Sequence, residues 1–206
     1  MLIVGLTGSI AMGKSVAARL LRRRRVAVHD ADAAVHRLIG VGGSAVGAVG
    51  AAFPGSVRDG AVDRQALGRL VFSDAKALSR LEAILHPLAR GAARDFIAVA
   101  ARRRCRLVVL DIPLLFETSA EKSVDAVFVV SAPGWLQRSR ALRRPGMTPE
   151  KLDAILARQV PDAVKRRRAD HVLPSGRGFA ATDRALCAAL RALGTQRGRS
   201  WKPGWR

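Results

Sequence analysis

The feature that most constrains this chain is the segment over residues 8–15, whose sequence is GSIAMGKS. It matches G-x-x-x-x-G-K-[ST], the pattern of the phosphate-binding loop known as the P-loop. Glycine at its first position, Gly8, can take positive φ and turn the chain sharply, while Gly13 lets the backbone approach a phosphate closely. The amide N–H groups of such a loop point inward and attract an anion. The segment therefore predicts a nucleotide-phosphate site.

The residues around this loop supply the context that the motif requires. A chance match is an alternative in a chain with 19 glycines. Here an apolar run over residues 2–6 precedes the loop and predicts a buried strand, and a helix-forming run over residues 16–24 follows it. In that setting Lys14 can reach the β- and γ-phosphates of ATP, and the Ser15 hydroxyl can bind Mg²⁺.

The composition indicates one folded domain that favours anionic partners. A length of 206 residues and a hydrophobic content of 49% are sufficient for a sizeable core. The formal net charge of +20 predicts affinity for nucleotides, phosphorylated metabolites or nucleic acid, without choosing among them. Much of the excess is arginine in runs such as residues 22–25, and solvated helix faces are the alternative explanation for each run.

Cysteine usage and hydropathy indicate the compartment. Cys105 and Cys187 lie far apart and have no metal-type spacing, which predicts reduced thiols in a cytosol. Met1 leads directly into the first predicted strand, so we expect no signal peptide, and no apolar stretch is long enough to span a bilayer. The sequence therefore predicts a cytoplasmic protein without a membrane partner.

An acidic pair follows the second predicted strand. Residues 26–28 are a short apolar run, and the sequence HDAD after them carries Asp30 and Asp32. Carboxylates at the carboxyl end of a strand beside a P-loop strand face the ligand crevice of an open α/β sheet. One can support Mg²⁺ through water while the other accepts a proton from an attacking hydroxyl. Alternatively, one of them caps the helix predicted over residues 33–39; because a cap needs only one, the pair favours a function.

Residues 40–103 predict a helical insertion between the second and third strands. Its first part is rich in glycine and alanine, with turns at Pro54-Gly55 and Asp59-Gly60. Helices are predicted over residues 44–52, over residues 64–72 after an Asp63 cap, after a Ser73 cap, and over residues 80–103. Pro87 must kink the last of these or start a new helix. His86 is either a buried, hydrogen-bonded histidine or a substrate contact, and the residues alone favour the buried one.

Three further strands complete the predicted sheet, over residues 106–110, 124–130 and 169–173. The first of them ends in Asp111, a carboxylate that resembles the Walker B position supporting Mg²⁺. An amphipathic helix over residues 179–193 closes the fold. The polar, basic tail over residues 195–206 is expected to be mobile.

A basic helical hairpin is predicted between the last two strands. Its first helix, from residue 131, carries Arg140 and Arg144 on one face, since residues four apart are neighbours on a helix. Pro145-Gly146 ends this helix, and Thr148 caps a second one that runs to Gln159. A hairpin of this kind suits a mobile lid that closes arginine onto transferring phosphates.

Taken together, these motifs resemble the dephospho-CoA kinase family. The resemblance runs in family order from Leu6 to about Gly176, through LTGSIAMGKS, HDADAAVH, ILHPLAR, DIPLLFE, QRSRALRRPGMTPE and ILARQ. It implies an α/β fold: a P-loop kinase with a parallel sheet core flanked by helices, a helical substrate-binding insertion and a helical lid. It divides a single domain, residues 1–206, into a core (1–39, 104–132 and 161–194), a substrate region (40–103), a lid (133–160) and the tail (195–206).

The resemblance also implies a reaction, the transfer of the ATP γ-phosphate to the 3′-hydroxyl of dephospho-CoA, which is the last step of coenzyme A biosynthesis. Mg²⁺ is the expected cofactor, and ATP and dephospho-CoA are the expected partners of a monomer or weak oligomer. One alternative is another small P-loop kinase, acting on a nucleotide or a shikimate-like alcohol. A basic nucleic-acid-binding ATPase is the other; with no Tyr and few aromatic residues to stack bases, we expect no specific nucleic acid partner.

Carried over by position, the family's motifs give roles to individual residues. The implied ATP-binding residues are Ala11, Met12, Gly13, Lys14, Ser15, Val16 and Arg144, and the implied metal ligands are Ser15 and Asp111. The implied catalytic residues are Asp32 as general base, with Lys14 and Arg140 for the charge of the transition state. The implied substrate-binding residues are His86 and Asp30, and Asp30 is also expected to support the metal. Asp32 is preferred over Asp30 partly by analogy with related small-molecule kinases, so the two roles stay open.

Two stretches depart from the family pattern. The family has more glycine in the loop than this chain, which carries Ser9, Ala11 and the larger Met12 there. Because the backbone N–H groups survive these changes, nucleotide binding is still expected. After the last strand the family tends to have an Asn-x-Gly turn near adenine, where this chain has Pro174-Ser175-Gly176. No adenine contact is therefore predicted at that turn.

Overall fold

The computed structural model describes residues 1–71, 74–194, 196 and 198–199. These residues form two compact units, one made of Met1–His29 with Ala100–Arg206 and the other of Asp30–Val99. The helix after Asp30 thus belongs to the second unit, whereas the sequence predicts residues 1–39 as part of the core. Within the described residues, no helix combines the length and the apolar character needed to cross a membrane.

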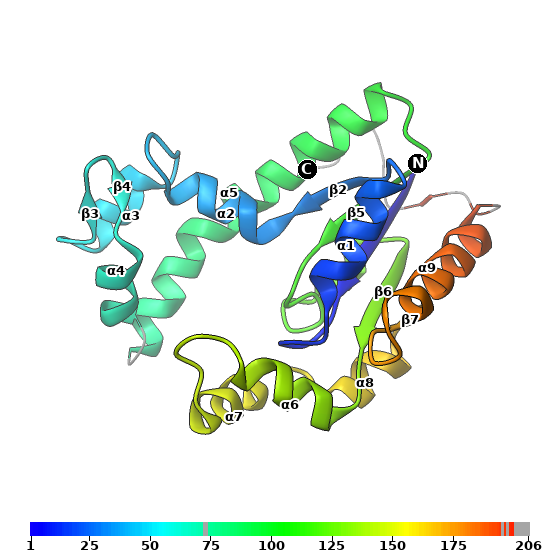
Figure 1. Cartoon of the computed structure of the whole chain (residues 1–206). Helices are drawn as coiled ribbons and strands as arrows, with labels where there is room; N and C mark the ends of the chain where they lie inside the picture. The colour runs from blue at the N-terminus through cyan, green and yellow to red at the C-terminus, as the bar shows by residue number, and fades with distance from the viewer. Residues whose placement is uncertain (72–73, 195, 197, 200–206) are drawn as a thin grey trace. The chain divides into compact units, whose positions relative to one another are not determined.

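The first unit is organised on a five-stranded sheet with the strand order β2-β5-β1-β6-β7 (Figure 1). The strands are β1 Leu2–Thr7, β2 Ala27–Asp30, β5 Leu107–Asp111, β6 Ala126–Ser131 and β7 His171–Pro174. β1 runs parallel to β5 on one side and to β6 on the other, and β6 runs parallel to β7. Since the order of strands reverses around β1, the carboxyl end of β1 is where such a sheet opens a ligand crevice.

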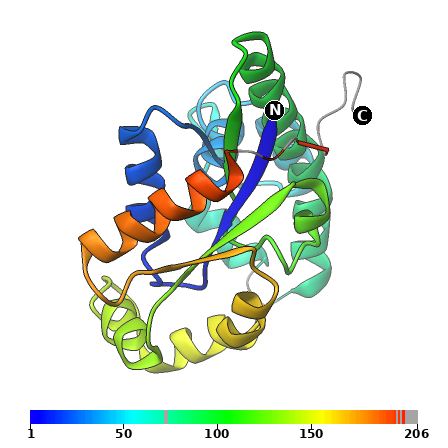
Figure 2. The same ribbon diagram turned by 90° about the vertical axis from the view of Figure 1, so that its right-hand side faces the viewer.

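Helices cover both faces of this sheet. The helices of this unit are α1 Lys14–Arg23, the 3₁₀ helix η1 Ala120–Ser123, α6 Gly134–Leu142, α7 Pro149–Ala157, α8 Asp162–Arg167 and α9 Phe179–Leu193, of which α6 and α7 form the hairpin that follows β6. α1 and α9 pack on one face, where Leu20 and Leu186 join Leu6 and Phe128 in a buried cluster (Figure 2). The residues on either side of Phe128 point the other way, into a cluster with Leu115. The alternation follows from the two-residue period of a strand.

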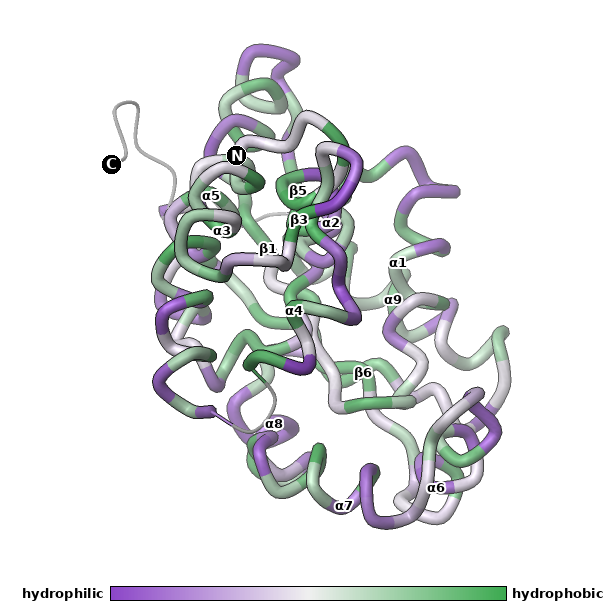
Figure 3. The backbone as a smooth tube through the Cα atoms, turned by 90° about the vertical axis from the view of Figure 1, so that its left-hand side faces the viewer, coloured by the Kyte–Doolittle hydropathy of each residue, from purple (hydrophilic) through white to green (hydrophobic). Residues whose placement is uncertain are grey.

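Burial on both faces explains the composition of the strands. β1 and β6 are buried along their whole length, as expected for parallel strands between two layers of helices. Figure 3 shows the hydrophobic residues gathered in β5 and β6, which lie on either side of β1. The continuous apolar runs of the sequence therefore predict these strands correctly, each within about two residues of its observed ends.

The second unit is mainly helical. Its elements are α2 Ala31–Ile39, α3 Val46–Ala52, the strands β3 Val57–Arg58 and β4 Ala61–Val62, α4 Arg64–Val71 and most of α5 Ala75–Arg102. Val49, Phe53 and Leu67 are central to its own buried cluster. β3 and β4 pair as a hairpin around Asp59 and Gly60, both with positive φ. The predicted turn is therefore confirmed, while the two short strands that it joins were not predicted.

Helix caps follow their local signals in this unit. The Asp63 carboxylate accepts hydrogen bonds from the N–H groups of Gln65 and Ala66 at 2.9 and 3.0 Å, as predicted for the start of α4. Ser73, the predicted cap of the next helix, lies outside the described residues, and Asp74 accepts the N–H groups of Lys76 and Ala77 there.

The helix predicted after Ser73 and the helix predicted over residues 80–103 form one helix, α5, in the structure. Pro87 lies inside it, so of the two alternatives predicted for this proline, the start of a new helix is wrong. Proline removes one N–H donor from the helix, but Ile84, Leu85 and Leu88 around it pack against the cluster of the second unit, which favours continuity. Most of the predicted tail, residues 195–206, lies outside the described residues.

The packing of α9 gives a stability prediction. Leu186 is fully buried, whereas Phe179 in the same helix is 50% exposed. We expect Leu186→Ala to lower the free energy of unfolding by about 2–5 kcal/mol, because it leaves a cavity in the core. Phe179→Ala removes a larger side chain and should cost less. Urea denaturation of both variants measures this; equal losses would contradict the assignment of Leu186 to the core.

Candidate active site

The loop between β1 and α1 has the shape that its sequence predicts, but Gly8 serves it differently. A Cβ atom on Gly8 would lie 2.7 Å from the carbonyl oxygen of Val130 in β6. Gly8 is not among the residues with positive φ, which in this loop are Ala11 at 59° and Gly13 at 87°. The prediction of positive φ at Gly8 is therefore wrong. Glycine is required there because the loop passes directly against the backbone of β6.

The loop presents several unpaired N–H groups. Met12 N–H donates to the carbonyl of Ser9 at 3.1 Å, and Val16 N–H donates to the carbonyl of Gly13 at 3.0 Å. Within the described residues, no backbone hydrogen bond is donated by the N–H groups of Ala11, Gly13, Lys14 and Ser15. α1 begins at Lys14, so the positive end of its dipole lies at the same place. This arrangement fits a polyphosphate.

Lys14 and Asp111 form an ion pair at the carboxyl ends of β1 and β5. Their side chains are 18% and 5% exposed. The motifs predict separate roles for these residues, at the phosphates and at the metal, and the structure brings the two side chains together. A cationic side chain that is already oriented in the loop can turn to a phosphate when one binds.

The donors near the loop fit Mg²⁺ as it is held in nucleotide sites. The Asp111 carboxylate and the exposed Ser15 hydroxyl are hard oxygen donors. Among the described residues there is no group of three or more His, Cys, Asp or Glu side chains that could hold a metal. Mg²⁺ does not need one, because it keeps several waters and takes one or two protein groups together with the phosphates.

Arg140 reaches the loop from α6. Its guanidinium donates to the Oγ and to the carbonyl oxygen of Ser175 at 3.1 and 2.9 Å. The Ser175 hydroxyl in turn donates to the carbonyl of Met12 at 2.6 Å. A Cβ atom on Gly13 would lie 3.6 Å from Nη1 of Arg140. Sequence analysis placed Arg140 correctly in a helix but missed Ser175, whose position just after β7 was the available signal.

Arg144 does not share a helix face with Arg140. α6 ends at Leu142, and Arg144 follows it in an exposed turn. The prediction of one shared face is therefore wrong. The reason is Pro145, since the residue before a proline is disfavoured in helical conformation. The second helix of the hairpin starts as predicted, with the Thr148 hydroxyl accepting the N–H of Lys151 at 3.3 Å.

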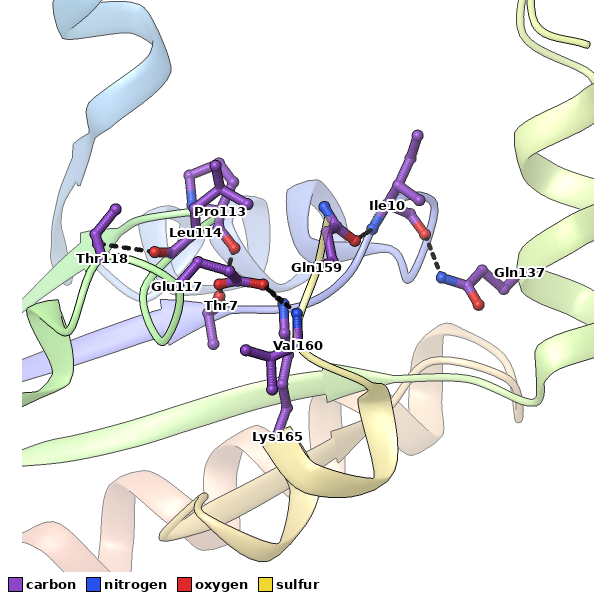
Figure 4. Close-up of polar contacts among 10 residues, drawn as sticks. All are labelled: Thr7, Ile10, Pro113, Leu114, Glu117, Thr118, Gln137, Gln159, Val160 and Lys165. Carbon is purple, nitrogen blue, oxygen red and sulfur yellow. Dashed lines mark hydrogen bonds and ion pairs between the residues drawn. The ribbon is translucent and has the colours of Figure 1, made fainter. Parts of the chain in front are cut away.

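Polar side chains connect the loop to the α6–α7 hairpin, and others connect the end of that hairpin to the segment after β5 (Figure 4). Gln137 Nε2 donates to the carbonyl of Ile10 at 2.9 Å, and Ile10 N–H donates to Gln159 Oε1 at 3.1 Å. Val160 N–H donates to Glu117 Oε1 at 2.9 Å, and the same oxygen pairs with the buried ammonium of Lys165 at 2.8 Å. Sequence analysis missed these contacts, which join segments far apart along the chain.

Glu117 is the charged centre of this region. Burial disfavours its charged form, but the ion pair with Lys165 and the N–H of Val160 outweigh burial and lower the pKa of Glu117. The Lys165 side chain is completely buried, on the short helix α8. Charged Glu117 therefore neutralises a cation that has no access to water.

The remaining predicted residues belong to the second unit. Asp30 Oδ1 accepts the N–H of Ala33 at 2.9 Å, so Asp30 is the N-cap of α2. Asp32 lies in the first turn of that helix and is exposed. His86 is exposed on α5, so the buried histidine that the residues alone favoured is wrong. His86 and the neighbouring Pro87 lie on the exposed side of α5.

Comparison with known proteins identifies the family. The model of the family described as dephospho-CoA kinase matches residues 2–179. The chain belongs to this family. A dephospho-CoA kinase of Paramagnetospirillum magneticum is 66% identical over 166 residues, which are 81% of this chain and 78% of that relative. The resemblance inferred from the motifs is confirmed.

Solved structures agree with the fold. A crystal structure from Thermus thermophilus superposes with a TM-score of 0.79 at 37% identity, covering 93% of this chain and 97% of that one. The dephospho-CoA kinase of Campylobacter jejuni, at 21% identity, superposes with a TM-score of 0.64 over 93% of this chain and 96% of its own. The predicted P-loop kinase fold, with a parallel sheet flanked by helices, is confirmed.

The Glu117–Lys165 pair predicts how stability depends on pH. Because its pKa is lowered on folding, charged Glu117 adds stability above its ordinary pKa, about 4.3, and this contribution is lost as the pH falls through the lowered value. We expect Glu117→Gln to cost about 3–5 kcal/mol near pH 7, since it leaves Lys165 buried without a partner. The difference from the natural protein should shrink below about pH 4.

Urea denaturation at a series of pH values measures this difference. The exposed Glu82 provides the control, because Glu82→Gln removes a carboxylate without uncovering a buried cation. A Glu117→Gln variant whose deficit stayed constant down to about pH 3 would mean that charge on this carboxyl is not what stabilises the protein.

Proposed function

We propose that this chain transfers the γ-phosphate of ATP to the 3′-hydroxyl of dephospho-CoA and so produces coenzyme A, the last step of its biosynthesis. The observation that carries the proposal is the family match over residues 2–179. The unpaired N–H groups of the loop, with Lys14 and Arg140 beside them, supply the chemistry that phosphoryl transfer needs. The family consists of ATP-dependent kinases, which agrees with this chemistry.

The loop holds the triphosphate in this proposal. The N–H groups of Ala11, Met12, Gly13, Lys14, Ser15 and Val16 line the path of the phosphates, and those of Ala11, Gly13, Lys14 and Ser15 have no other backbone partner among the described residues. Lys14 exchanges the Asp111 carboxylate for the β- and γ-phosphates. This exchange places its positive charge where negative charge is spread in the transition state.

Mg²⁺ is the cofactor that fits this site, held by the Ser15 hydroxyl and the Asp111 carboxylate together with the phosphates. When bound, it neutralises charge on the phosphate oxygens. When Lys14 turns to the phosphates, it no longer neutralises the charge of Asp111, which favours a cation beside that carboxylate.

Arg140 and Arg144 complete the charge around the phosphates. Arg140 is held by Ser175 beside the loop, so little side-chain freedom is lost when it contacts a phosphate. Arg144 lies in an exposed turn of the hairpin and binds ATP from there. We assign the hairpin, residues 133–160, to the lid and residues 40–103 to the substrate region.

Asp32 is the proposed general base, because it is exposed and its carboxylate accepts no hydrogen bond as a cap. Asp30 has one oxygen engaged by Ala33, which fixes the carboxylate for binding the ribose and supporting the metal. His86, exposed on α5, contacts the substrate. The enzyme works in the cytoplasm as a monomer or weak oligomer, and its positive charge serves anionic metabolites, with no specific nucleic acid and no membrane partner.

Incubation with ATP, Mg²⁺ and a panel of acceptor alcohols tests the function. We expect dephospho-CoA to gain one phosphate at the ribose 3′-hydroxyl, detected by mass spectrometry and located by fragmentation. Shikimate and nucleoside monophosphates serve as competing acceptors. Preferential phosphorylation of one of these would contradict the proposal.

Substitutions of Asp30 and Asp32 test whether each carboxylate acts in the reaction or only caps a helix. We expect Asp32→Asn to keep ATP affinity and to lose about 10²–10⁴-fold in kcat, because a hydroxyl is a poor nucleophile without a base. Asp30→Asn should retain the cap, since asparagine caps helices as well as aspartate does, and should shift the Mg²⁺ dependence of the rate. Titration of the rate against Mg²⁺ for both variants is the measurement.

Asp63 provides a matched control in the same unit, because Asp63→Asn changes another helix cap and should leave turnover unaltered. If Asp30→Asn lost turnover at unchanged Mg²⁺ dependence while Asp32→Asn needed more Mg²⁺, the two roles would be reversed. If neither variant lost more than a few-fold in rate, the pair would have only the structural role that Asp30 already fills.

A further inference from the structure

Ile10, in the middle of the phosphate loop, has both of its backbone groups held by glutamine side chains (Figure 4). Its N–H donates to Gln159 Oε1 at 3.1 Å, and its carbonyl accepts from Gln137 Nε2 at 2.9 Å. Gln137 is 8% exposed. Ile10 lies outside any helix or strand, yet its N–H has an acceptor and its carbonyl has a donor, as they would in a β-sheet.

The two glutamines come from the two ends of one hairpin. Gln137 lies in the first half of α6, and Gln159 follows the end of α7 at Ala157. Side chains from both ends of the hairpin therefore bind the same loop residue, Ile10, while Ala141 and Leu152 of the hairpin pack against Ala11. Glu117 holds the end of the hairpin next to Gln159, because its Oε1 accepts the N–H of Val160 and pairs with Lys165.

The two hydrogen bonds to Ile10 lie next to the residue whose backbone conformation is the least favourable in the loop. Ala11, the next residue, has φ of 59°, a left-handed conformation that is uncommon for any residue except glycine. Such a conformation persists only where its surroundings impose it. The N–H of Ala11 is among those without a backbone partner in the described residues, so the orientation of the Ile10–Ala11 peptide decides whether that donor faces a phosphate.

We propose that Gln137 and Gln159 are positioning residues that hold Ile10 and thereby keep the N–H groups of the loop directed at ATP. The inference rests on the proposed function, in which the loop binds the triphosphate. The two side chains are not interchangeable, because Gln159 must accept a hydrogen bond and Gln137 must donate one. Neither side chain has to touch the nucleotide to act in this way.

Replacing each glutamine by glutamate tests the proposal, because glutamate accepts hydrogen bonds but, when ionised, donates none. Gln159→Glu keeps the acceptor for Ile10 N–H, whereas Gln137→Glu turns an acceptor toward the Ile10 carbonyl. Both variants add the same charge near the loop, so the difference between them isolates the hydrogen bond. Gln196→Glu adds that charge at an exposed position of the same unit and serves as control.

We expect Gln137→Glu to raise the Kd for ATP about tenfold or more relative to Gln159→Glu, with the KM for dephospho-CoA unchanged. Gln159→Glu should remain within a few-fold of Gln196→Glu. Calorimetric titration with ATP and steady-state kinetics give these values, and thermal unfolding reports whether each variant is folded. The split between ATP affinity and acceptor KM is a change that a merely structural role would not produce.

Equal ATP affinity of folded Gln137→Glu and Gln159→Glu would overturn the proposal, as would a lower melting temperature with unchanged Kd. If Gln137→Glu fails to fold, Gln137→Met removes the donor without adding charge, and it should still raise the Kd for ATP several-fold; an unchanged Kd would again overturn the proposal. Failure of the proposed function is distinguishable, because the natural protein itself would then fail to phosphorylate dephospho-CoA, whereas the proposal on the glutamines is judged by the difference in ATP affinity between the variants.

Discussion

The structure depends on a loop in which the N–H groups of Ala11, Gly13, Lys14 and Ser15 have no backbone partner among the described residues. Unsatisfied donors of this kind are unfavourable unless a ligand or water takes them, so internal hydrogen bonds alone do not hold this loop in shape. Its surroundings hold it instead: Gly8 lies against the carbonyl of Val130, Ser175 binds the carbonyl of Met12, and Gln137 and Gln159 bind Ile10. The hydrogen bonds within the loop, such as Met12 to Ser9, involve N–H groups other than the unpaired ones.

Two ion pairs lie near this loop. Lys14 pairs with Asp111 at the carboxyl ends of neighbouring strands, where a nucleotide can exchange one anion for another. Glu117 and Lys165 form a second pair near the end of the α6–α7 hairpin, and the side chain of this lysine is completely buried. The first pair has partners that can change, whereas the second is fixed by burial because neither charge can separate without a large desolvation cost. The two pairs differ in the exposure of the lysine, whose side chain is 18% exposed in Lys14 and completely buried in Lys165.

Local signals in the sequence predicted what depends on neighbouring residues. Apolar runs predicted the strands, the loop motif predicted a turn between a strand and a helix, and Asp63 and Thr148 predicted helix starts that the structure confirms. Errors arose where a distant contact or a neighbouring constraint decides. Pro145 ends α6 before Arg144. Ile10 is hydrogen-bonded to Gln137 and Gln159, which lie 127 and 149 positions away, and the periodicity of a sequence cannot predict contacts at such separations.

The departures of this loop from the glycine-rich family pattern have a structural counterpart. Ala11 takes a left-handed conformation at some cost compared with glycine, and the side chain of Met12 is nearly buried, with its sulfur accepting the N–H of Ala132 at 3.1 Å. Side chains in the loop therefore add contacts with β6 and its continuation that glycine could not make. Less conformational freedom in the unbound loop means that less is lost when phosphate binds, so these residues favour a preorganised site. The same logic explains why Ser175, in place of the family's asparagine turn, faces the loop and Arg140: its hydroxyl joins two elements whose relative position determines where the arginine charge lies.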